Sequence, residues 1–139
     1  MRFLIIVRSV PEFEAATQPV PSEALLAAMT DYHAQLAQAG VLLDANGLKP
    51  SRDGWRIRYH GGQRTVVDGP FTETKELIAG YTLIQVRSRA EALEWARRFP
   101  NPVGEGRDAE IEVRPLYEPE DFGPSPAAER LRALPTLQD

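Results

Sequence analysis

The sequence predicts an α+β fold in which one antiparallel sheet carries two helices on the same face. Short apolar or alternating segments indicate strands, and two longer stretches repeat apolar residues at helical spacing. Their order along the chain is strand, helix, strand, β-hairpin, strand, helix, strand. Two strand–helix–strand units divided by a hairpin are typical of a ferredoxin-like sandwich.

The first unit begins with a strand at Phe3–Val7, whose two alternating faces are both apolar, as in a central strand covered on both sides. Prolines interrupt residues 9–21, which are therefore expected to form a loop. Ser22 is a suitable N-cap for a helix over residues 23–39. The apolar residues of that helix recur at helical spacing, namely Leu25, Met29, Tyr32 and Leu36.

A second strand is expected at residues 41–48. The hairpin follows, because Trp55, Ile57 and Tyr59 alternate with charged or polar residues, which is the period of a half-buried strand. A turn at residues 60–63 leads to a returning strand at 64–67.

The second unit has a strand at Tyr81–Val86 and a final strand around Ile111 and Val113. Between them, Ser88 and Glu91 have the spacing of a capping box, in which each side chain accepts a hydrogen bond from the backbone of the other residue. The helix that starts there ends before Pro100.

The predicted topology leaves one face of the sheet without helices. That face carries alternate strand residues, some of them apolar, and a second copy of the chain is the simplest cover for it. The sequence therefore predicts a homodimer with a two-sheet core. Residues 1–117 are expected to form this domain, and residues 118–139 a proline-rich acidic tail. The tail has two interpretations, a frayed end or an arm that packs on the partner subunit.

Composition excludes several classes of function. The chain has 139 residues, which suits one domain, and its 16 Lys and Arg against 20 Asp and Glu give a net charge of −4. Because the arginines are scattered, no basic patch for nucleic acid is expected. The absence of cysteine removes thiol catalysis, disulfides and thiolate metal sites. Without a signal peptide or an apolar run of membrane length, a cytoplasmic protein with no membrane partner is expected.

The run Asp68-Gly69-Pro70-Phe71-Thr72-Glu73-Thr74-Lys75-Glu76 closely resembles the signature of DGPF-domain proteins, within the wider YCII-related family. The similarity continues through Gly80-Tyr81, Ala90–Ala96 and Glu112–Pro115, and so spans residues 2 to about 117. It implies a dimeric α+β barrel of ferredoxin-like subunits. It also implies an activity that is unassigned in most members, some of which are encoded beside alternative sigma factors. The wider family is thought to include small enzymes that act on aromatic or other small molecules.

The wider family is associated with a His–Asp pair whose histidine lies early in the first helix. Here that stretch reads Leu25-Leu26-Ala27-Ala28-Met29, and the helical histidine is His33, one turn later. The pair is therefore not transferred to this chain.

Two residues are candidates for moving a proton. Asp68 ends a strand before a Gly-Pro pair, where a buried carboxylate could act as a general base or could cap the following turn. His33 lies on or beside the apolar stripe of the first helix, where it could serve as an acid–base group or as a hydrogen-bonded structural residue.

The candidates for binding a substrate are Phe71, Glu73, Lys75, Glu76 and Arg114. Lys75 between two carboxylates could hold an anion, although such clusters also occur as solvated turns or surface ion pairs. Arg114 shares a strand face with Glu112 and could bind a carboxylate or pair across the sheet.

No motif indicates a cofactor or a metal. The two histidines lack the spacing of metal ligands, and the glycine pairs lack the context of a phosphate-binding loop. The sequence thus predicts a protein that binds or transforms a small, aromatic or anionic molecule by cofactor-independent acid–base chemistry. The alternative is a non-catalytic ligand-binding or regulatory protein linked to a sigma factor or another protein partner.

Overall fold

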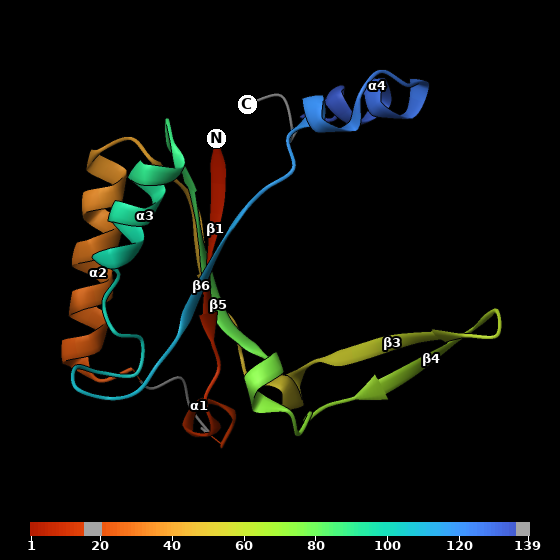
Figure 1. The fold of residues 1–139 in the computed structure, drawn as a ribbon. Helices are drawn as coiled ribbons and strands as arrows, with labels where there is room; N and C mark the ends of the chain where they lie inside the picture. The colour runs from red at the N-terminus through yellow and green to blue at the C-terminus, as the bar shows by residue number, and fades with distance from the viewer. Residues whose placement is uncertain (16–20, 136–139) are drawn as a thin grey trace.

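The computed structural model describes residues 1–15 and 21–135. A four-stranded antiparallel sheet, with strand order β2-β5-β1-β6, forms its centre. Its strands are β1 (Arg2–Arg8), β2 (Leu42–Gly47), β5 (Ile78–Gln85) and β6 (Ile111–Pro115). Helices α2 (Glu23–Gln38) and α3 (Arg89–Arg97) lie on one side of the sheet (Figure 1). The predicted α+β fold of ferredoxin-like type is confirmed.

The core lies between this sheet and the two helices. Alternate residues of β1, Phe3, Ile5 and Val7, are buried on the helix side. Phe3 and Ile5 pack with Leu36 of α2 and with residues of β5 and α3. This is the alternation that a strand with one face toward a core must show.

Tyr32 of α2 connects the two helices within the core. Its hydroxyl donates a hydrogen bond to the carbonyl oxygen of Trp95 at 2.6 Å. Burial raises the pKa of Tyr32 to about 12, and the nearby Arg98 guanidinium opposes that change. The phenol therefore stays protonated in the folded protein well above the pH at which an exposed tyrosine ionises.

Both helix starts have the predicted caps. Ser22 Oγ accepts a hydrogen bond from the backbone N–H of Leu25, and Ser88 Oγ accepts one from Glu91. The Glu91 carboxylate accepts from the backbone N–H of Arg87 at 3.0 Å. The second half of the capping box is thus displaced by one residue from its predicted position.

The structure differs most from the prediction in two segments. The expected loop at residues 9–21 contains a short helix, α1 (Pro11–Ala15), because proline is tolerated at the first position of a helix. Residues 16–20 of that segment lie outside the described part. Strand β5 begins at Ile78 rather than Tyr81, since Gly80 pairs with both Val7 and Gly47. A short helix, α4 (Pro126–Arg132), lies near the C-terminus.

The hairpin strands β3 (Trp55–His60) and β4 (Gln63–Asp68) form a separate two-stranded sheet. Trp55, Ile57 and Tyr59 are all exposed within the described chain, so the expectation of a half-buried strand is wrong for the isolated subunit. The hairpin and the C-terminal segment both extend on the side away from α2 and α3 (Figure 1). Three short turns of 3-10 helix complete the described elements, η1 (Ser51–Asp53), η2 (Thr74–Glu76) and η3 (Pro119–Phe122).

No helix among residues 1–15 and 21–135 has the length and apolar character that crossing a membrane requires.

Candidate functional site

The signature segment packs directly on the turn η1. The backbone N–H of Gly69 donates to the Gly54 carbonyl at 3.1 Å, and that of Phe71 donates to Ser51 Oγ at 3.0 Å. A Cβ atom on Gly69 would lie 1.9 Å from the Ser51 carbonyl oxygen, so only glycine fits there without a backbone shift. Gly69 of the signature therefore has a structural role.

A carboxylate from α1 completes this contact. Glu14 accepts hydrogen bonds from the backbone N–H of Ser51, at 3.0 Å, and from the Ser51 hydroxyl. Ser51 thereby links Glu14 to Phe71, which joins α1, η1 and the signature segment. Sequence reasoning missed Glu14 and Ser51, because they are 37 positions apart and neither belongs to a local motif.

A groove of about 510 Å³ opens beside this contact. Its lining includes the aromatic residues Trp55 and Phe71 and the aliphatic residues Leu48 and Ile78. The Arg56 guanidinium stacks over the Phe71 ring, 3.8 Å from its centroid. The charged groups in the lining are two cations and three carboxylates, namely Lys49, Arg56, Glu14, Asp53 and Glu76. A groove with flat apolar surface and a few charged groups can hold a small planar molecule.

Some of the predicted residues gather at this groove. Phe71 and Glu76 line it. Asp68 is the cross-strand neighbour of Trp55 at the base of the hairpin. The Asp68 side chain is exposed and makes no hydrogen bond with any described residue, so nothing there supports the turn-capping alternative. Glu73 and Lys75 are exposed and lie outside the lining, as the solvated-turn alternative expects.

His33 lies elsewhere, between α2 and the sheet. Its Nδ1 is 2.7 Å from the Met29 carbonyl, and its Nε2 is 2.8 Å from Thr82 Oγ1. Because a carbonyl can only accept, Nδ1 donates, and in the neutral ring Nε2 accepts from the buried Thr82 hydroxyl. Both ring nitrogens therefore have protein partners, which favours the structural alternative. Proton transfer by His33 stays a prediction.

Arg114 lies on the opposite face of the sheet, away from the helices. Its guanidinium is 3.8 Å from Glu112, which also pairs with Arg8 at 2.5 Å. Arg8 of β1 therefore pairs with Glu112 across the sheet, whereas Arg114 contacts a residue of its own strand, so the cross-sheet alternative for Arg114 stays a prediction.

The same open face carries a polar cluster that sequence reasoning missed. The Tyr81 hydroxyl donates to Asp44 at 2.9 Å, and the Asn46 amide lies 3.0 Å from each of the two. An irregularity in β2 between Leu42 and Asp44 shifts the register, so Asp44 and Asn46 pair with Leu83 and Tyr81. A bulge of this kind re-aims side chains and has no local sequence signal here.

Within the described ranges, no three His, Asp or Glu side chains lie close enough together to hold a metal ion.

Sheet order and helix placement define the chain as an α+β protein of the ferredoxin-like class. Residues 1–117 match the YCII-related domain, so the chain belongs to the YCII-related family. An uncharacterized protein of Rhizobium meliloti (strain 1021) is 37% identical over 82 residues. The match covers 59% of this chain and 66% of that relative, slightly less than two thirds of its length.

Proposed function

We propose that the protein binds a small planar molecule in the groove between the hairpin base and the signature segment. The observation that carries this proposal is that Trp55 and Phe71 line one groove beside the family signature. Aromatic side chains stack on planar ligands with little loss of conformational entropy. The contact between Arg56 and Phe71 supports the proposal, because the planar guanidinium shows that the Phe71 ring can stack with a flat group.

Two of the five charged groups in the groove lining are cations, and these could hold an acidic substituent on the ligand. Glu14 already accepts two hydrogen bonds from Ser51, whereas Lys49 is exposed and Arg56 packs on a ring. The two cations could therefore face a carboxylate or phenolate. Asp68 and Glu76 are the nearby carboxylates that could exchange a proton with such a ligand without a cofactor.

The proposal includes association of two copies through the open face of the sheet. Leu4 and Ile6 of β1 and Leu83 of β5 form an aliphatic strip there, and each is only half-buried in a single chain. The described helices α2 and α3 lie on the other face (Figure 1). A second sheet is the natural cover for such a strip.

The test is a titration with benzoate and with cyclohexanecarboxylate, two carboxylates that differ in ring planarity. In a Trp95→Phe variant, Trp55 is the remaining fluorescent tryptophan and reports on the groove. Benzoate is expected to quench Trp55 and cyclohexanecarboxylate much less. Phe71→Leu should weaken benzoate binding by about tenfold, whereas Phe122→Leu, at an exposed aromatic elsewhere, should not. Equal binding of the two acids, or no effect of Phe71→Leu, would count against the proposal.

The regulatory alternative assigns the acidic C-terminal segment to a protein partner such as a sigma factor. Tyr117 and Phe122 are exposed there and lie ring to ring, with centroids 5.4 Å apart. Deletion after Tyr117 would abolish capture of that partner and leave groove binding intact.

A further inference from the structure

One face of the hairpin is apolar and exposed. In the β3–β4 register, Trp55 pairs with Asp68, Ile57 with Val66, and Tyr59 with Arg64, so all six side chains share one face. Trp55 is 65% exposed, Tyr59 71% and Val66 62%. An apolar patch of this kind on a two-stranded ribbon indicates a docking surface, because isolated ribbons of this kind are marginally stable in water.

The hairpin is also basic. Residues 55–68 carry three arginines, at positions 56, 58 and 64, against one aspartate, which is a net charge of +2. Arg56 packs on Phe71 and Arg64 lies over Tyr59, while Arg58 is exposed.

The C-terminal arm, residues 116–135, has the complementary character. It carries four carboxylates against two arginines, a net charge of −2. Its exposed aromatic side chains are Tyr117 at 76% and Phe122 at 51%. The hairpin and the arm therefore both expose aromatic side chains, and their net charges are opposite in sign.

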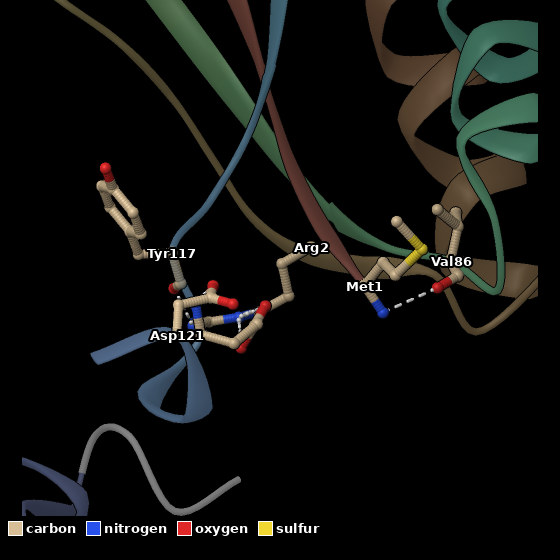
Figure 2. A network of polar contacts seen from close by, with 6 residues as sticks. Met1, Arg2, Val86, Tyr117 and Asp121 are labelled. Carbon is tan, nitrogen blue, oxygen red and sulfur yellow. Dashed lines mark hydrogen bonds and ion pairs between the residues drawn. The ribbon is translucent and has the colours of Figure 1, made fainter. Parts of the chain in front are cut away.

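Hydrogen bonds and an ion pair attach the first residues of the C-terminal arm to Arg2 of β1. Arg2 forms a bidentate pair with Glu118, with Nε 3.0 Å from Oε1 and Nη2 3.0 Å from Oε2. Asp121 accepts from the Glu118 backbone N–H at 2.7 Å (Figure 2). The backbone N–H of Leu116 donates to the Arg2 carbonyl at 3.0 Å. These contacts fix the direction in which the arm leaves β6.

Hairpin and arm leave the central sheet from opposite ends, and both extend on the side away from α2 and α3 (Figure 1). The open face of the sheet, with the aliphatic strip described above, lies between them. A second sheet packed on this face would thus have a projecting segment at each end.

We propose that, in a homodimer packed through the open sheet faces, the hairpin of each copy docks on the C-terminal arm of the other. This inference rests on the proposed association of two copies. A face-to-face pair with twofold symmetry can have its axis along the strands or across them. An axis along the strands brings hairpin to hairpin and arm to arm, which places like charges together. An axis across the strands brings each +2 hairpin to a −2 arm, and the electrostatics select this second arrangement.

Disulfide trapping tests which segments meet. Because the chain has no cysteine, single reporters are unambiguous. A Val66→Cys chain mixed with a Phe122→Cys chain is expected to give a covalent dimer under mild oxidation. Each variant alone is expected to stay uncrosslinked. Crosslinking of Val66→Cys with itself, with no crosslink between Val66→Cys and Phe122→Cys in the mixture, would overturn the proposed docking and indicate an axis along the strands.

A charge-reversal cycle gives a second, energetic test. Arg64→Glu, on the apolar face of the hairpin, and Glu120→Arg change exposed side chains for which no ion pair exists among the described residues. Each should raise the dimer dissociation constant about tenfold, and the double variant should restore it. Arg97→Glu, on the outer surface of α3, is the control and should have no effect.

The outcomes separate the two proposals. A wild-type protein that sediments as a monomer at all accessible concentrations would overturn the dimer itself and with it the docking. A stable wild-type dimer that is unaffected by both reversals, with no trapping in the mixture, would leave the dimer standing and overturn the contact between hairpin and arm.

Discussion

The Ser51 carbonyl oxygen occupies the space into which a Gly69 side chain would project, 1.9 Å from the ideal Cβ position. The same serine accepts the Phe71 N–H through its hydroxyl and donates to Glu14. The signature segment therefore has a structural role, in addition to any part it plays in ligand binding. It packs the base of the hairpin against α1 and η1 and forms part of the lining of the groove.

Gly69→Ala should destabilise the protein by about 3 kcal/mol, because the backbone of η1 must move to admit a methyl group. Gly54→Ala is the matched control from the same contact. Its Cβ would meet the nearest atom at 3.7 Å, and its φ of −121° suits alanine. It should therefore cost less than about 1 kcal/mol. Urea unfolding followed by circular dichroism measures both, and equal midpoints would contradict the steric argument.

Stability should fall steeply at alkaline pH because of Tyr32. Its pKa is raised from 10.0 to about 12 in the folded protein, so between these values the unfolded chain loses the phenolic proton first. The stabilisation is fully present below pH 10 and is lost as pH rises through 12. One pKa unit corresponds to about 1.4 kcal/mol, so this difference is worth roughly 3 kcal/mol.

Tyr32→Phe should flatten the alkaline limb of the stability profile and cost about 1 kcal/mol at neutral pH through the lost hydrogen bond to Trp95. Tyr117→Phe changes an exposed tyrosine and serves as the control. If both variants keep the wild-type slope between pH 10 and 12, Tyr32 is not its source.

Asp68→Asn should leave the free energy of unfolding within about 0.5 kcal/mol of wild type, because the side chain is exposed and has no hydrogen bond in the described chain. Under the catalytic hypothesis the variant loses turnover and keeps its affinity for the ligand. Thermal unfolding and a binding titration distinguish this from turn capping, which would instead lower the melting temperature.

Glu118→Gln should loosen the C-terminal arm while the sheet stays intact. It removes the charge from the bidentate pair with Arg2, the contact at the root of the arm. Hydrogen–deuterium exchange should speed up in residues 116–122 and stay unchanged in β1 and β5. Glu129→Gln disrupts a local, exposed pair with Arg132 and should change exchange only within α4. Unaltered exchange in residues 116–122 of Glu118→Gln would show that the backbone contacts suffice.

Local signals were enough to predict the elements that pack on the core. Ser22 and Ser88 mark helix starts because capping satisfies backbone donors within one turn. The apolar alternation of β1 and the stripe through Tyr32 and Leu36 identify the buried faces, because burial follows the period of each element. The fold class follows from the order of these elements.

Contacts between distant segments decided the rest. Glu14, Ser51 and Phe71 meet because α1, η1 and the signature segment converge at the hairpin base, and no periodicity relates positions so far apart. The register shift in β2 places Asp44 beside Tyr81. The alternation of Trp55, Ile57 and Tyr59 predicted a buried strand face, but no other part of the described subunit covers these side chains. Amino-acid order encodes local propensity and the period of burial. Which segment covers which face depends on three-dimensional packing, which for the open sheet and the hairpin includes a second copy under the proposed assembly.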